Sequence, residues 1–370
     1  MPLLVISLDA VGDHVYEAMA KDPIRYPNIA RIFGQGHYQS GVHTIFVSNT
    51  YPIHTTVSTG KYPVDHGITS NYLPATKANP KPWAQFHHLI KAKTIWKAAR
   101  EKKLKTAAFL WPVTCGAPIN WHMPEYHKAP KESQILGNLR HGSKWFQLKA
   151  FLKHKNQLKG IQQPFLDNFT TNCVQMLLKK KTPDLICVHL IAYDDIFHQV
   201  GTQDEAKLNE AKSAIDFNLG KILDAWGDKP YLIFSDHSAL NVNQTINLNT
   251  YYRHGHFVQN GGSAFTNRID TSAVDEHWFE RYLTKEEMAQ SGFSGKFTVG
   301  IAAKAGFNFS ETEVKGDHGY PPTYPNYQTF YHFSRELAYH EKLQGSIRDV
   351  TAIIAKELGL DMDIIKEYNI

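Results

Sequence analysis

Residues 185–237 read LICVHLIAYDDIFHQVGTQDEAKLNEAKSAIDFNLGKILDAWGDKPYLIFSDH, and their pattern indicates the class of the fold. Its two apolar runs, Leu185–Leu190 and Tyr231–Phe234, have the composition of buried strands. Between them, over Asp204–Trp226, apolar residues recur every three or four positions, and the turn sequence of residues 227–230 ends the pattern. A strand, a long helix and a second strand make a βαβ unit, which predicts parallel pairing of the two strands.

The same alternation extends over most of the chain and predicts an α/β fold with a central, mostly parallel sheet flanked by helices. Two segments, Thr114–Gly160 and Ser238–Lys315, look irregular and are rich in His, Asn and aromatic residues. We expect one catalytic domain over residues 1–370, with a cap-like insertion around 238–315 that covers the site. Further strands are expected at Leu3–Ser7 and Thr106–Trp111, and further helices at Thr94–Lys103, Pro164–Lys180 and Ser346–Leu358.

Composition excludes several classes of protein. The net charge of +5 comes from 40 basic and 35 acidic residues spread along the chain, so we expect no nucleic-acid polymer as a partner. The three cysteines form no CxxC pair, which argues against a disulfide framework and for a reducing compartment. The apolar N-terminal run is interrupted by Asp9 before it could serve as a signal or membrane segment. These features predict a cytoplasmic protein without a membrane partner.

Metal-ligand residues follow the predicted strands. In an open α/β sheet the ligand crevice lies beyond the carboxyl ends of the strands, so residues from distant parts of the chain can converge there. Oxygen and imidazole ligands without thiolate suit zinc, with manganese or iron as substitutes. Six candidates are too many for one catalytic site that keeps an open position, so we expect two metals. The candidates are Asp9, Asp194, His198, Asp236, His237 and His318.

Two metals about 3.5–4 Å apart can stabilise both the attacking and the leaving oxygen of a displacement at phosphorus, so phosphoryl or phosphonyl chemistry is expected. A hydroxyl nucleophile is available at Thr50, because a metal can lower the pKa of a threonine hydroxyl. Pro52 is expected to hold the chain extended and rigid beside it. Asn71 could donate its amide to a nonbridging oxygen of the phosphoryl group.

In their order along the chain, these residues resemble the nucleotide pyrophosphatase/phosphodiesterase branch of the alkaline phosphatase superfamily. The resemblance runs nearly from end to end. It rests on Val5–Ala10, Thr50–His54, Thr59–Ile68, Thr94–Trp96, Phe109–Pro112, Asp194 and His198, Ser235–His237, His318–Tyr320 and Ile347–Val350.

The resemblance implies an alkaline-phosphatase-like three-layer sandwich and a role for each matched residue. Thr50 would be the nucleophile that forms a covalent phospho-threonine, and Asn71 would contact the phosphate. Tyr51 stands where the family usually has a phenylalanine that stacks on a nucleobase. One zinc would be bound by Asp194, His198 and His318, and the other by Asp9, Thr50, Asp236 and His237.

The leading hypothesis is therefore a two-zinc phosphodiesterase or nucleotide pyrophosphatase that acts on a small phosphodiester or nucleotide. A phosphonate hydrolase of the phosphonoacetate type remains an alternative on the same fold. A phosphomonoesterase ranks third, because no arginine lies near Thr50 or Asn71 in the sequence to neutralise an additional phosphate charge. A binding protein without catalysis is disfavoured, since all seven proposed metal-site residues are present. The oligomeric state is left open.

Overall fold

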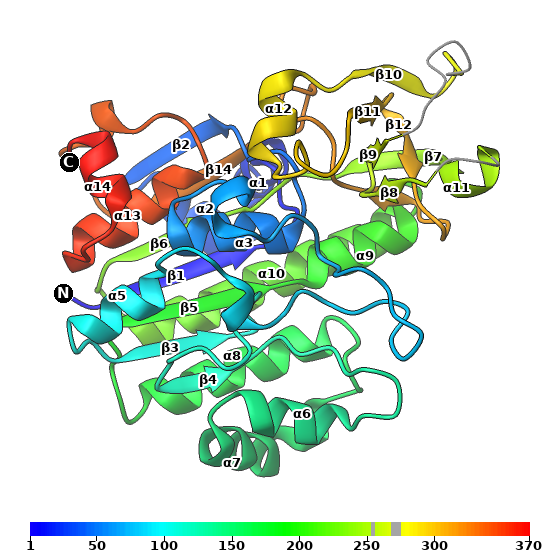
Figure 1. The fold of residues 1–370 in the computed structure, drawn as a ribbon. Coiled ribbons are helices and arrows are strands. Elements are labelled where there is room, and N and C mark those ends of the chain that lie inside the picture. The colour runs from blue at the N-terminus through cyan, green and yellow to red at the C-terminus, as the bar shows by residue number, and fades with distance from the viewer. Residues whose placement is uncertain (253–255, 268–274) are drawn as a thin grey trace.

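A seven-stranded sheet forms the centre of the computed structural model, which describes residues 1–252, 256–267 and 275–370 (Figure 1). Strand β14 pairs antiparallel with both of its neighbours, β2 and β6, and the other pairs are parallel. The prediction of a central, mostly parallel sheet is confirmed. The strands, in order across the sheet, are β2 (His37–Val42), β14 (Thr329–Phe333), β6 (Tyr231–Phe234), β1 (Leu3–Leu8), β5 (Leu185–Leu190), β3 (Thr106–Phe109) and β4 (Trp121–Met123).

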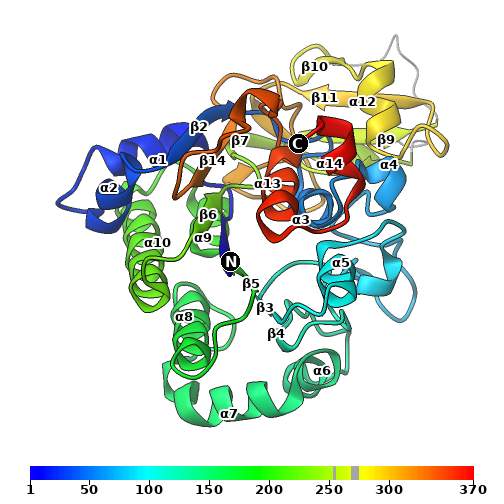
Figure 2. The same cartoon turned by 90° about the vertical axis from the view of Figure 1, so that its left-hand side faces the viewer.

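Helices cover both faces of this sheet, as Figure 2 shows with the sheet between two groups of helices. Successive side chains of a strand point to opposite faces, so β1 contributes to two cores. Leu4, Ile6 and Leu8 pack on one side and Leu3 and Val5 on the other. The first face carries α1 (Asp13–Ala20), α2 (Pro27–Phe33), α8 (Phe165–Leu178) and α10 (Glu205–Trp226), and the second carries α3 (Thr50–Thr59), α5 (Ile95–Glu101), α13 (Arg348–Leu358) and α14 (Asp363–Tyr368).

The predicted βαβ unit is β5, α10 and β6, with bounds within one residue of those expected. The other predicted helices are present as α5, α8 and α13, and the other predicted strands as β1 and β3. Asp204 caps α10, because its side chain accepts a hydrogen bond from the backbone N–H of Lys207.

The expectation that Thr114–Gly160 is irregular was wrong. This segment contains β4, α6 (Gln134–His141), α7 (Lys144–His154) and the short 3₁₀ helix η2 (Lys155–Gln157). Helix α7 buries only Gln147 and Ala150 and leaves Trp145 84% exposed. Since its apolar residues do not share a buried face, the periodicity that identifies a helix is missing.

The segment 238–315 is not irregular either, and that expectation was also wrong. Its described residues contribute strands to two small sheets and include two short helices, all beyond the carboxyl ends of the central parallel strands (Figure 1). Its role as a cap stays a prediction. One sheet has the order β10 (Phe279–Tyr282), β11 (Val299–Ala303), β9 (Ser263–Thr266), β8 (Val258–Gln259), and the other has the order β12 (Gly306–Phe309), β7 (Leu240–Ile246), β13 (Gly316–Asp317). The helices are α11 (Leu248–Tyr251) and α12 (Lys285–Gln290).

The remaining short elements connect these layers. They are α4 (Pro63–His66), α9 (Ala192–Val200), η1 (His87–Leu89) and η4 (His340–Lys342). Among the described residues, none of the helices has both the length and the apolar composition needed to cross a membrane.

Candidate active site

The strand register brings three ligand-bearing segments to one edge of the sheet. Leu8 pairs with Leu190, and Ser7 pairs with Phe234, so β1, β5 and β6 end side by side. The next residues along each chain segment supply Asp9, Asp194 and the pair Asp236 and His237. Parallel pairing therefore turns three sequence-distant fragments into neighbours.

The candidate ligands form overlapping groups whose ligand atoms lie within 4.8 Å of one another. Nε2 of His237 is 3.5 Å from Asp9 and 3.3 Å from Asp236, and Nε2 of His198 is 3.4 Å from Asp194. The structure thus brings together all six residues that the sequence analysis selected. The groups are Asp9, Asp236 and His237; Asp194, His237 and His318; and His198, Asp317 and His318.

Asp194 and His198 both lie on α9, one helical turn apart. Helix α9 starts immediately after β5 because Asp167 of α8 accepts hydrogen bonds from the backbone N–H groups of Ile191 and Ala192, at 2.9–3.2 Å. This cap comes from a residue more than twenty positions away, so local sequence patterns do not reveal it.

Each of the three histidines presents Nε2 to the site, because its Nδ1 donates to a fixed acceptor. His198 donates to the carbonyl of Gly316 at 2.7 Å, and His237 donates to that of Ser238 at 3.1 Å. His318 donates to Oδ1 of Asn49 at 3.1 Å. Hydrogen bonds of this kind orient imidazole rings and select the tautomer that binds a metal.

Thr50 is the first residue of α3, and its Oγ1 lies 3.3 Å from Nε2 of His237. The expectation that Pro52 holds an extended segment was wrong. Pro52 lies in the first turn of the helix, where its missing N–H has no helical partner to lose, and the extended residue is Asn49. The nucleophile candidate therefore stands at a helix N-terminus, where a negative charge is stabilised.

Burial sets the direction of the pKa shift for four members of the cluster, whereas the ion pair of Asp194 and His198 lowers the pKa of that carboxyl and raises the pKa of that imidazole to about 10. Burial raises the pKa of Asp9 well above its usual value, reinforced by the carboxylate of Asp236, and it raises the pKa of Asp236 to about 7. Burial lowers the pKa of His237 to about 4 and that of His318 to about 3. Carboxylates crowded together away from water are unfavourable without a cation, so the cluster is suited to bind positive charge.

Comparison with known proteins identifies the family of this chain. The family model described as type I phosphodiesterase / nucleotide pyrophosphatase matches residues 3–287. The chain belongs to this family.

A human relative, ectonucleotide pyrophosphatase/phosphodiesterase family member 1, is 30% identical over 132 residues, which are 33% of this chain and 14% of the relative. The chain thus matches about a seventh of that protein's length. The fold matches murine ectonucleotide pyrophosphatase/phosphodiesterase 5 with a TM-score of 0.68 at 16% identity, over 97% of this chain and 95% of the other. It also matches a phosphonoacetate hydrolase from Sinorhizobium meliloti 1021, with a TM-score of 0.69 at 14% identity, over 97% and 96%. These neighbours establish the alkaline-phosphatase-like fold that the sequence analysis expected.

In this family member, a cavity of about 740 Å³ opens beside the cluster. Thr50, Asn71 and Tyr51 all line it. Asn71 is oriented by the backbone N–H of Tyr51, which donates to its Oδ1 at 2.9 Å. The ring of Tyr51 is only 1% exposed and packs against Trp83 with ring centroids 5.2 Å apart, so it offers a nucleobase almost no free surface.

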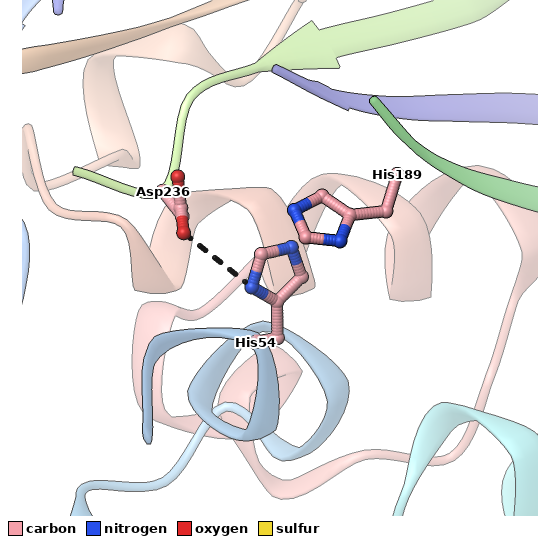
Figure 3. A group of neighbouring side chains, drawn as sticks. All are labelled: His54, His189 and Asp236. Carbon is pink, nitrogen blue, oxygen red and sulfur yellow. Dashed lines mark ion pairs between the residues drawn. The ribbon is translucent and has the colours of Figure 1, made fainter. Parts of the chain in front are cut away.

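Sequence reasoning assigned no role to two buried histidines, His54 and His189, whose rings lie next to Asp236 (Figure 3). Nδ1 of His54 is 3.6 Å from Asp236, and Nε2 of His189 is 3.0 Å from Asp9. His54 follows Thr50 by one turn of α3, and His189 lies within β5. For His189, one feature of the sequence could have indicated a role in the site: it is a histidine inside an otherwise apolar strand, just before the carboxyl end of that strand.

Proposed function

We propose that this protein is a two-metal phosphodiesterase that hydrolyses phosphodiester or phosphoanhydride bonds of small nucleotide-type substrates. The observation that carries the proposal is the convergence of six carboxylate and imidazole ligands around Thr50 at the carboxyl edge of the sheet. Membership of the type I phosphodiesterase / nucleotide pyrophosphatase family supports the same class of reaction.

The residues present fit two metal ions. Oδ1 of Asp9, Oδ1 of Asp194 and Oδ2 of Asp236 are buried and have no hydrogen-bond partner among the described residues. Buried polar atoms normally have partners, so these oxygens are suited to coordinate cations. We assign Asp194, His198 and His318 to one ion and Asp9, Thr50, Asp236 and His237 to the other. Zinc suits this donor set best, and manganese or iron is tolerated.

When bound, the metals would supply Lewis-acid activation of the Thr50 hydroxyl and neutralise charge at the phosphoryl group. In the first step, Oγ1 of Thr50 forms a bond to phosphorus as the bond from phosphorus to the leaving oxygen breaks. The hydroxyl proton is released to water, and the leaving oxygen takes up a proton. In the second step, water attacks phosphorus, which restores the Thr50 hydroxyl and releases the product. Asn71 donates to a nonbridging oxygen in both steps.

Small nucleotides fit the size and chemistry of the cavity. Its volume of about 740 Å³ lies within the range typical of small-molecule sites. A structure of the murine relative is described as a complex with AMP. Since Tyr51 is covered by Trp83, we assign it to the cavity wall and not to base stacking.

Two alternative reactions remain on this fold. The phosphonoacetate hydrolase neighbour supports a phosphonate hydrolase as the second candidate. Phosphomonoesterase activity is less favoured, because Lys81 is the one lysine or arginine that lines the cavity within the described residues, and its ammonium group lies over the ring of Tyr72. A monoester carries an additional negative charge and would gain from a cation next to Thr50.

The test compares turnover of the p-nitrophenyl ester of thymidine 5′-monophosphate, p-nitrophenyl phosphate and phosphonoacetate by zinc-loaded protein. We expect the diester to have the highest kcat/KM. Preference for the monoester or for phosphonoacetate would replace the proposed reaction by the corresponding alternative.

We also propose a reducing, cytoplasmic location. The support is that the three cysteines, Cys115, Cys173 and Cys187, are free and buried.

A further inference from the structure

Two asparagines of the cavity wall come from different parts of the fold. Asn71 lies beside the start of α3, because the backbone N–H of Tyr51 donates to its Oδ1. With this oxygen occupied, the amino group of Asn71 is the part left to meet a ligand. Asn260 lies in the turn between β8 and β9, in the segment that follows β7. Both residues line the cavity together with Thr50.

A chain of hydrogen bonds sets the orientation of Asn260. Nδ1 of His318 donates to Oδ1 of Asn49 at 3.1 Å, so the amide nitrogen of Asn49 is free to donate to Oδ1 of Asn260 at 3.4 Å. The hydroxyl of Ser70 donates to the same oxygen at 2.9 Å. Since an amide oxygen only accepts, these contacts identify Oδ1 of Asn260 and leave its Nδ2 as the donor.

That donor is buried and unsatisfied. Asn260 is 5% exposed, and its Nδ2 has no hydrogen-bond partner within the ranges that the structure describes. A buried N–H group without a partner is unfavourable, so native proteins rarely retain one without a function. Asn71 and Asn260 are also neighbours, because Ser70, which contacts Asn260, directly precedes Asn71.

The turn that carries Asn260 is held tightly against the metal-ligand segment. The N–H of Gly262 donates to the carbonyl of His318 at 2.8 Å. Gly261 and Gly319 have positive φ angles of 68° and 85°, and a Cβ on Gly319 would lie 1.9 Å from the carbonyl oxygen of Asn260. The two backbones therefore approach as closely as glycine allows, and Asn260 is placed with little freedom.

We propose that Asn260 is a second amide donor for the oxygen atoms on phosphorus, acting beside Asn71. This inference rests on the proposed function for its substrate class, a phosphoryl or phosphonyl group. The segment after β7 then contributes directly to the reacting group, and Asn260 stabilises the negative charge that develops on the nonbridging oxygens.

The decisive variant is Asn260→Asp. It keeps the size of the side chain and an oxygen that accepts from Asn49 and Ser70, but it replaces the amide donor by a negative charge. We expect kcat/KM for the thymidine diester to fall about 100-fold, with zinc content unchanged. Asn260→Ala should lower kcat/KM for the same diester by about 10- to 100-fold. The matched control is Asn249→Ala, because Asn249 also lines the cavity but both ends of its amide are bonded to the backbone of Phe257.

A second readout does not depend on turnover. Inorganic phosphate binding to the zinc-loaded protein, measured by calorimetry, should weaken at least tenfold in Asn260→Asp and remain unchanged in Asn249→Ala. Equal phosphate affinity in wild type and Asn260→Asp, or no phosphate binding by the wild type, would overturn the inference. If the wild type binds phosphate through Asn260 but hydrolyses none of the three substrates, the inference stands and the proposed function fails.

Discussion

Nε2 of His189 lies 3.0 Å from Oδ2 of Asp9, and neither side chain is more than 3% exposed. Nδ1 of His189 donates to the carbonyl of Leu110 at 3.2 Å, which holds the ring in place across the sheet. The fully buried imidazole of His189 therefore lies directly against the carboxylate of Asp9.

The first prediction concerns this contact. Groups that orient metal ligands typically contribute 10- to 100-fold to metal affinity. We expect His189→Leu to weaken zinc binding by about this factor, measured by competition with a chromogenic chelator. His122, a buried histidine of β4 that contacts Thr114, provides the control. His122→Leu should leave zinc affinity unchanged, and an equal loss in both variants would show that His189 acts only through general packing.

The second prediction concerns the nucleophile. Thr50→Ala should reduce turnover of the thymidine diester by at least 1000-fold while keeping at least one zinc per chain, because the remaining ligands come from other elements. Thr50→Ser retains a hydroxyl and should retain measurable turnover. Mass spectrometry of rapidly quenched wild-type protein should detect a phosphoryl adduct on Thr50. Normal turnover by Thr50→Ala would exclude its role as the nucleophile.

The third prediction concerns the number of metals. His198→Ala should remove one zinc per chain and leave the other, because His198 is grouped with His318 and contacts Asp194, and is not part of the group of Asp9, Asp236 and His237. The measurement is zinc content by atomic emission after dialysis. Two zinc ions in His198→Ala, or one in the wild type, would contradict the assignment.

Chelator treatment of the wild type should lower its melting temperature, since a ligand that binds only the folded state stabilises it by about 2.7 kcal/mol at 100 times its dissociation constant. Added zinc should restore both the melting temperature and turnover.

The fourth prediction concerns Asp167, which caps α9. Burial raises the pKa of Asp167 to about 6, against the opposing effect of its hydrogen bonds to Ala192 and Ile191. Between the usual pKa of 3.8 and about 6, the folded state holds this proton more tightly than the unfolded state. The contribution of Asp167 to the free energy of unfolding therefore falls as pH rises through this window and is constant above it.

Asp167→Asn lacks this titration. As the pH rises from 4 to 6, metal-free wild type should become less stable relative to metal-free Asp167→Asn. The measurement is the free energy of unfolding of both proteins by urea denaturation. A difference that is constant over this range would show that the pKa of Asp167 is not raised. Titration of the histidine cluster affects both proteins equally, so it cancels when their free energies of unfolding are subtracted.

Most of the central fold was predictable from local patterns. Apolar runs such as Leu185–Leu190 and the periodicity of Asp204–Trp226 report burial directly, because a strand between two layers is apolar on both faces and a covering helix is apolar on one. Helix α7 and the sheets of the segment 238–315 were missed. Helix α7 buries little, and the short strands of that segment, such as Ser263–Thr266, carry mixed residues.

The candidate site was also predictable only in part. The Asp and His residues that follow the strands indicated a metal site, since residue type can be read directly from the sequence. Their pairing into groups, the capping of α9 by Asp167 and the contact of His189 with Asp9 depend on residues far apart in the chain. Asn260 had no signal in the sequence, because an asparagine in a turn is ordinary until its neighbours are known.

The α/β class, the family resemblance and the set of candidate ligands could be inferred from the sequence, because hydrophobic periodicity and residue chemistry are local properties. Which donors face the cavity, which nitrogen of each histidine is free and which aromatic rings are covered became known only from the folded structure. Those properties follow from parallel strand register and from hydrogen bonds between distant segments, which arise only when the chain is folded.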